Sequence, residues 1–155
     1  MRALGLSTCL ILSVAPGLGA QAAPTEKPAV LHWGPAPAVF PQGARMAVVS
    51  GDPSKAGLFT VELAMPSGYK IAPHFHPTDE TVEVKKGTLL VGMGNTFDAS
   101  KAKAMKAGEK ASMRANAHHF AAAQGATFLT VTAMGPFGMT YVNPADDPQK
   151  QVAKP

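Results

Sequence analysis

From residue 46 onward the chain alternates between short apolar-polar segments and turn residues, and this pattern restricts it to β-structure. The clearest segment is 59–65, in which every second residue is large and apolar, namely Phe59, Val61, Leu63 and Met65. Side chains on a strand point alternately to its two faces, so this period of two predicts a half-buried strand. Further strands are predicted at 69–72, 80–86, 88–93, 110–114, 118–122, 126–133 and 137–142. Many short strands separated by turns indicate an all-β sandwich or barrel.

One segment favours a helix instead, namely residues 98–107. Asp98 or Ser100 could cap the start of this helix, and Gly108 follows its end. The sequence therefore predicts a single β-barrel domain, residues 45–142, that carries one short helix.

Residues 1–22 differ from the rest of the chain. They begin with Arg2, continue with an apolar run from Leu4 to Val14, and end in small residues, which is typical of a cleaved secretory signal. Pro16 interrupts the run well short of the length that a membrane span needs. We therefore expect a periplasmic or secreted protein with no membrane span.

The segments on either side of the predicted barrel are irregular. Residues 23–44 hold a density of prolines that excludes a helix and favours an extended arm: Pro24, Pro28, Pro35, Pro37 and Pro41. The arm also carries apolar residues, namely Leu31, Trp33, Val39 and Phe40. We expect it to lie on the outside of its own barrel or of a neighbouring subunit. Residues 143–155 are expected to form a loose C-terminal tail.

Charge and cysteine content exclude two classes of protein. The full chain has 14 basic and 10 acidic residues. Loss of Arg2 with the signal leaves 13 basic residues and a net charge of +3, too small an excess to suggest nucleic-acid binding. The single cysteine, Cys9, also lies in the removed segment. The mature protein is therefore not a disulfide-stabilised one, and its stability must come from its core and from metal if metal binds.

Residues 74–84 carry the clearest functional pattern. His74 and His76 are one residue apart, so on a strand both imidazoles point the same way and can approach one ion. Glu80 shares the apolar face of the next predicted strand with Val82 and Val84. A carboxylate on such a face is costly unless a cation or several donors satisfy it. The pattern therefore predicts a metal ion close to Glu80.

With their neighbouring glycines, these residues resemble the motifs of the cupin family. The first cupin motif is Gly, five residues, His, one residue, His, three or four residues, Glu, six residues, Gly, and it is matched in full by Gly68, His74, His76, Glu80 and Gly87. The second motif is Gly, five residues, Pro, one residue, Gly, two residues, His, three residues, Asn. Gly108 and His119 fit it, whereas Arg114, Asn116 and Ala123 replace its proline, glycine and asparagine. The resemblance covers 68–123, and the flanking strand pattern extends it to roughly 45–142.

The resemblance implies a small jelly-roll barrel that holds a divalent metal ion through three histidines and one glutamate. Carried over by position, the ligands are His74, His76, Glu80 and His119. His118 and His119 point to opposite faces of a strand, and the spacing from Gly108 favours His119 as the inward one. Such a set suits iron, manganese, nickel, copper or zinc. Cupins often pair their barrels, so we also expect a homodimer, with the apolar arm at 29–40 as a physical reason.

Two functions remain open at this point. One is an exported metal-binding protein without assigned activity, in which the metal is structural or helps to hold a small-molecule ligand. The other is a metal-dependent oxygenase, isomerase or decarboxylase that acts on a small oxygen-bearing molecule. An enzyme needs a separate acid or base, and the sequence offers only Tyr69 and Tyr141 as candidate hydrogen-bond donors and Arg114 as a candidate anion partner. The scarcity of charged residues around the motifs favours the first function.

Overall fold

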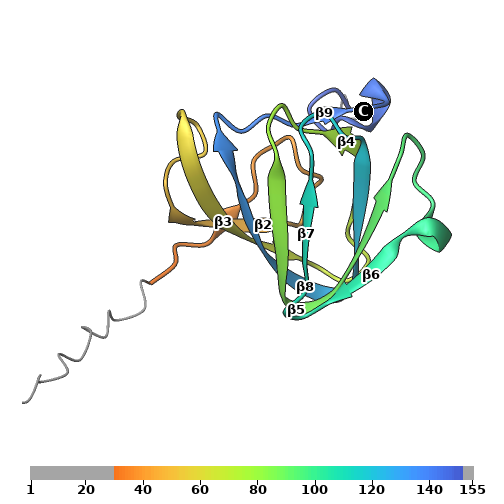
Figure 1. The fold of residues 1–155 in the computed structure, drawn as a ribbon, viewed down its shortest axis with the longest axis horizontal. Coiled ribbons are helices and arrows are strands. Elements are labelled where there is room, and N and C mark those ends of the chain that lie inside the picture. Colours follow the sequence, from red (N-terminus) through yellow and green to blue (C-terminus); the bar gives the residue numbers. More distant parts are fainter. Residues whose placement is uncertain (1–29, 152–155) are drawn as a thin grey trace, which may run out of the picture.

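The computed structural model describes residues 30–151, which form a curled antiparallel β-sheet (Figure 1). Its strands are β1 (Gly34–Pro35), β2 (Arg45–Ser50), β3 (Gly57–Met65), β4 (Lys70–Phe75), β5 (Glu80–Met93), β6 (Lys103–Lys106), β7 (Lys110–Met113), β8 (His119–Gly135) and β9 (Thr140–Tyr141). Two short 3-10 turns accompany them, η1 (Ala99–Lys101) and η2 (Pro144–Asp146). The predicted signal at 1–22, the first residues of the arm and residues 152–155 lie outside the described residues.

The two longest strands, β5 and β8, organise the barrel. They pair with each other from end to end, while the second edge of β5 pairs with β7 and then with β6. The second edge of β8 pairs with β4 and then with β3. Shifts in register between Val84 and Thr88 bend both strands, so that one half of the sheet folds over the other (Figure 1). The all-β jelly roll predicted from the sequence is confirmed.

Gly87 lies at this bend and explains why the first motif ends in glycine. Its φ of +85° is in the left-handed region, which other residues rarely adopt. A Cβ atom here would lie against the carbonyl oxygen of Ala126 on β8, closer than real contacts allow. A side chain would therefore push the two long strands apart at the point where the sheet folds.

The interior of the barrel is filled by the inward faces of the strands. On β3 the alternating residues Phe59, Val61, Leu63 and Met65 are all buried, which confirms the predicted period of two. The strands predicted at 80–86 and 88–93 are halves of the single strand β5, because the bend at Gly87 interrupts the alternation without ending the strand.

The predicted helix at 98–107 is wrong. Only η1 is helical, and β6 follows it, pairing with residues 88–91 of β5 and burying Met105. The physical reason is tertiary: the outer edge of β5 needs hydrogen-bond partners, and pairing with it outweighs the weak local preference for helix. The strand predicted at 137–142 is also much shorter than expected, since only β9 forms there.

The described part of the arm, residues 30–44, lies against its own barrel. Phe40 is buried in the core at 8% exposure. The Tyr69 hydroxyl donates a hydrogen bond to the carbonyl oxygen of Pro41 (2.6 Å), and the Tyr141 hydroxyl donates one to the carbonyl oxygen of Val39 (2.9 Å). The arm therefore packs on its own barrel, but it does not lie on the outside as expected, because Phe40 enters the core and makes the arm a wall of the barrel. Among the described residues, no helix has the length and apolar character to cross a membrane.

Candidate metal centre

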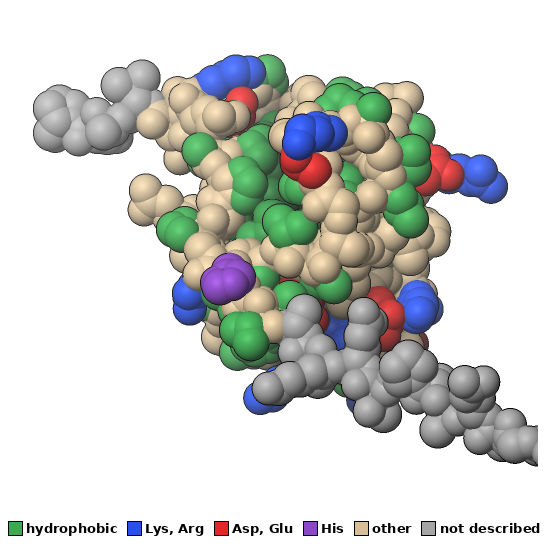
Figure 2. Space-filling model, turned by 90° about the vertical axis from the view of Figure 1, so that its left-hand side faces the viewer, with side chains coloured by type: hydrophobic (Ala, Val, Ile, Leu, Met, Phe, Trp, Pro, Cys, Tyr) green, Lys and Arg blue, Asp and Glu red, His purple; other side chains and the backbone are tan. Residues whose placement is uncertain are grey.

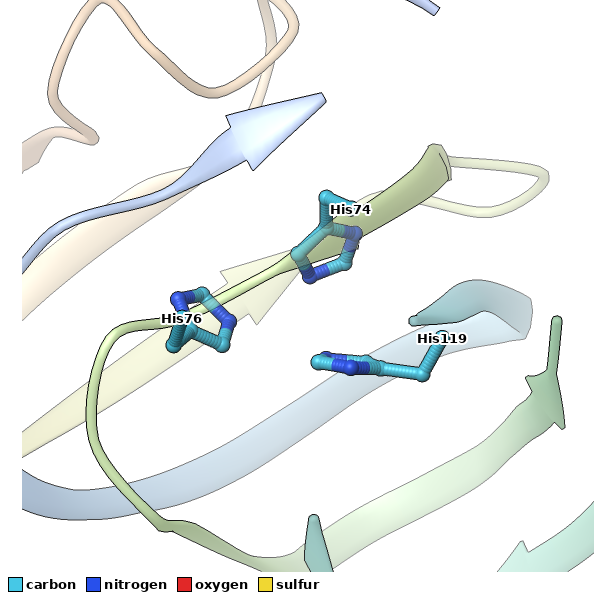
Figure 3. Close-up of side chains that lie close together, drawn as sticks. All are labelled: His74, His76 and His119. Carbon is cyan, nitrogen blue, oxygen red and sulfur yellow. The ribbon is translucent and has the colours of Figure 1, made fainter. Parts of the chain in front are cut away.

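Three neighbouring strands bring together the residues predicted to bind metal, and Figure 3 shows the three histidines among them. His74 lies on β4 directly opposite His119, the first residue of β8. His76 follows β4, and Glu80 is the first residue of β5. All four side chains are buried, with exposures of 3% for His74, 4% for His76, 7% for Glu80 and 3% for His119. A buried cluster of one carboxylate and three imidazoles needs an explanation, because polar groups are rarely placed inside a barrel without a partner.

Backbone carbonyls fix the orientation of all three imidazoles. In each ring Nδ1 lies within hydrogen-bond distance of a carbonyl oxygen: that of Ala72 for His74 (2.8 Å), of Gly138 for His76 (2.7 Å) and of Ala117 for His119 (2.9 Å). Since a carbonyl oxygen can only accept, Nδ1 must be the protonated nitrogen in every ring. The lone pair of a neutral ring is then on Nε2. This is the arrangement by which proteins orient histidines that bind metal.

The free atoms of the cluster converge on one point. One ligand atom from each of His74, His76 and His119 lies within 4.8 Å of the other two. The Oε2 atom of Glu80 is 3.6 Å from Nε2 of His76 and 3.5 Å from Nε2 of His119. Neighbouring ligands of one transition-metal ion are separated by about 3 to 4 Å at ordinary bond lengths. Lone pairs that face each other at this spacing require a cation between them, and these residues could bind a divalent metal.

The electrostatics of the cluster favour its metal-binding form. Burial, reinforced by the neighbouring His119, lowers the pKa of His74 to about 3, so this ring is neutral at physiological pH. Burial alone would raise the pKa of Glu80, but the imidazoles of His119 and His76 outweigh it and hold this pKa below its ordinary value. The site therefore presents a neutral imidazole together with an ionised carboxylate, which are the ligand forms that a divalent ion binds.

His118 faces away from this cluster. Its Nδ1 atom lies 2.6 Å from Oδ1 of Asn95, and its ring stacks on Phe75 with centroids 5.0 Å apart. The structure thus brings His119 rather than His118 into the barrel, as the spacing from Gly108 favours.

A small apolar cavity of about 80 Å³ adjoins the cluster. It is lined by Pro37 and Phe40 of the arm, by Pro53, Phe137 and Met139 of the loops, and by inward residues of the strands such as Val61, Leu63, Ile71, Val82, Leu89, Met113 and Leu129. The face of the molecule in Figure 2 is hollowed, and hydrophobic side chains surround the hollow. The polar residues that line the cavity are His74, His76, Glu80 and His119. Any small ligand of the ion would therefore sit in a hydrocarbon environment.

The other candidate residues do not line the cavity, although the ring of Tyr141 lies beside that of His74, with centroids 6.1 Å apart. The hydroxyls of Tyr69 and Tyr141 hold the arm, and Arg114 is exposed and does not line the cavity. Sequence reasoning missed the loop after β8, where Gly138 provides the carbonyl for His76 and Phe137 packs on that imidazole with centroids 5.1 Å apart. Nothing in the sequence near residue 137 signals this role, because the contact depends on how the barrel closes.

Comparison with known proteins identifies the fold. No protein-family model matches the sequence, and no curated protein matches it. Among solved structures, the chain is similar to a putative acetylacetone dioxygenase from Methylibium petroleiphilum PM1, with a TM-score of 0.59 and 22% identity over 88% of this chain and 90% of the other. An RmlC-like cupin from Shewanella frigidimarina matches with a TM-score of 0.50 and 17% identity over 59% of this chain and 76% of its own. The chain has the cupin fold. A conserved protein with a double-stranded β-helix domain from Klebsiella pneumoniae also matches, with a TM-score of 0.52 and 25% identity over 67% of this chain and 84% of its own.

The structure also explains a departure from the second cupin motif. Asn116 stands where the motif has glycine, and it has a φ of 61°. Asparagine tolerates this left-handed conformation better than most residues, so the turn before β8 keeps its shape. The backbone N–H of Asn116 donates a hydrogen bond to the carbonyl oxygen of His76 (2.8 Å), which ties the turn before His119 to the loop after β4. The substitution therefore leaves the position of His119 intact.

Proposed function

We propose that this protein binds one divalent transition-metal ion through His74, His76, Glu80 and His119, and that the ion holds a small oxygen-bearing molecule in the adjoining cavity. The observation that carries the proposal is the convergence of three backbone-oriented imidazoles on one buried carboxylate. Within residues 30–151 no lysine or arginine lines the cavity beside this group of acceptors, so no basic side chain there offers them a cation.

The chain's own residues prepare the site before any ligand arrives. The carbonyl oxygens of Ala72, Gly138 and Ala117 keep each ring from turning, so little conformational entropy is lost on binding. The negative charge of Glu80 offsets half the charge of a divalent ion inside the apolar barrel. When bound, such an ion supplies positive charge and Lewis acidity to an oxygen ligand.

Measurement of bound metal in wild type and two matched variants tests this proposal. His119→Ala removes a proposed ligand, whereas His118→Ala changes the adjacent residue, which faces outward. We expect about one ion per chain in the wild type and in His118→Ala, and a loss of affinity of at least about 100-fold in His119→Ala. If His119→Ala keeps full affinity for metal, and circular dichroism shows that it is folded, the proposed ligand set is contradicted.

A second candidate function is oxygenase chemistry on the bound molecule. Two observations support it: the cavity lies directly beside the ligand cluster, and the solved structure that matches 88% of this chain is described as a putative acetylacetone dioxygenase. The described cavity lining contains no acid or base beyond the four cluster residues, which gives little support to proton-moving isomerases. An oxygen electrode gives the test: metal-dependent oxygen uptake with small diketones supports an oxygenase, and its absence across metals supports a binding protein.

Export and dimerisation remain proposals. N-terminal sequencing of protein from the periplasm or the medium should find a mature chain that begins near residue 23. The described part of the arm packs on its own barrel, so it no longer supports a homodimer. The support now comes from exposed apolar side chains of the neighbouring strands β2 and β3, with Val48 at 47% and Leu58 at 65% exposure. Light scattering of the mature protein should give twice the mass of one chain.

A further inference from the structure

We propose that the molecule held in the cavity is a small monoanion that meets the ion through oxygen and is otherwise apolar. This inference rests on the metal site proposed above and names the class of ligand that the site selects. It follows from the charge of the cavity lining and from the cavity's size.

The lining offers a ligand almost nothing but hydrocarbon. Apart from the cluster, the residues around the cavity are aliphatic, aromatic, methionine or proline side chains. No lysine or arginine lines it within residues 30–151. A carboxylate or phosphate group that extends beyond the ion would therefore meet no donor or cation, and burying an unpaired charge is costly.

Charge balance at the ion then selects one negative charge on the ligand. A divalent ion together with ionised Glu80 has a net charge of +1, because the three imidazoles are neutral ligands. A chelating monoanion brings this buried group to neutrality. A dianion of the same shape leaves one uncompensated negative charge among apolar side chains, and a neutral chelator leaves one positive charge. Neutral groups are the ones that a low-dielectric interior accommodates at least cost.

The arm limits the size of the ligand. Phe40 lines the 80 Å³ cavity on one side and, on the other, a second cavity of about 270 Å³ between the arm and the C-terminal segment. Its ring stacks against Phe137, with centroids 6.2 Å apart and planes inclined by 5°. The tyrosine bonds to Pro41 and Val39 hold the backbone on both sides of this ring. With Phe40 in this place, only a compact ligand fits beside the ion.

Pyruvate and oxalate are a matched pair of probes for the charge. Both can chelate through two oxygens on adjacent carbons, and they differ in that pyruvate has a methyl group where oxalate has a second charged oxygen. Each affinity is measured by the absorbance change of cobalt-loaded protein and divided by the affinity of the same anion for aqueous cobalt. We expect this normalised affinity to be larger for pyruvate by about tenfold or more. An equal or larger normalised affinity for oxalate would overturn the proposal.

A charge placed in the lining gives the second readout. Met139 is half-buried, lines the cavity and follows Gly138, the residue that holds His76. Met139→Lys adds the missing cation and should shift the normalised preference toward oxalate by about tenfold. Met134→Lys is the control, because Met134 is 48% exposed and does not line the cavity. An unchanged preference in a folded, cobalt-loaded Met139→Lys protein would also count against the proposal.

Failure of this inference is distinguishable from failure of the metal site. If the wild type does not take up cobalt, the proposed function itself is wrong. If it takes up one cobalt ion per chain and does not favour the monoanion, the metal site stands and only the ligand class is wrong.

Discussion

Acid should destabilise the metal-free protein through His74. The folded protein holds the pKa of this ring at about 3, against an ordinary value of 6.5, because the ring is buried. A depressed folded pKa means that the unfolded state binds a proton first. The stability contributed by the neutral ring is therefore present above pH 6.5 and is lost as the pH falls toward 3.

The size of the effect follows from the same values. From pH 6.5 down to pH 4 the unfolded state takes up the proton while folded His74 stays largely neutral. These roughly 2.5 pH units, at about 1.4 kcal/mol per unit, amount to about 3 kcal/mol of the free energy of unfolding. Glu80 acts in the same direction at lower pH, because its folded pKa is also held below the ordinary value of 4.5.

Urea denaturation of the metal-free protein at pH 7, 5 and 4 measures this loss. His74→Gln removes the titrating ring. It should therefore abolish most of the loss of about 3 kcal/mol in the free energy of unfolding between pH 7 and pH 4, even if the variant is less stable at pH 7. His32→Gln is the control, because His32 is an exposed histidine of the arm. A pH dependence in His74→Gln as steep as that of the wild type would refute the reasoning.

Three further predictions concern the barrel. Phe40→Ala should lower the free energy of unfolding by about 3 to 5 kcal/mol in chemical denaturation, and a loss below about 1 kcal/mol would mean that the arm is not part of the core. The same variant should bind ligands larger than pyruvate, as the absorbance of the cobalt-loaded protein would show. Gly125 has nearly the same φ as Gly87, +83° against +85°, but a Cβ there meets nothing within 4 Å. Gly125→Ala should therefore lower the free energy of unfolding by about 1 to 2 kcal/mol, and Gly87→Ala should lower it clearly more. Equal losses of stability in thermal unfolding would disprove the close approach of β8 to Gly87. Asn116→Gly should keep stability within about 0.5 kcal/mol, whereas Asn116→Ala should lose about 1 kcal/mol; the same measurement decides whether the left-handed turn matters.

The sequence by itself determined the features that depend on short-range periodicity. Alternation along β3 and the first half of β5 indicated strands and the faces that they bury, because neighbouring side chains on a strand must point to opposite sides. The same rule placed Glu80 on the apolar face and separated His119 from His118. Three of the four candidate ligands lie within seven residues of one another, so their grouping was already visible in the sequence.

Only the tertiary structure decided the features that depend on distant segments. Residues 98–107 have local signals for a helix, yet β6 forms there because the far edge of β5 requires a partner. The carbonyl of Gly138 orients His76 across 62 positions of sequence, and the arm closes the cavity through Phe40. The charge and size of the cavity are likewise decided by residues from most of the strands. Such contacts have no local signature, because they are set by how the sheet folds over itself and not by the period of any one strand.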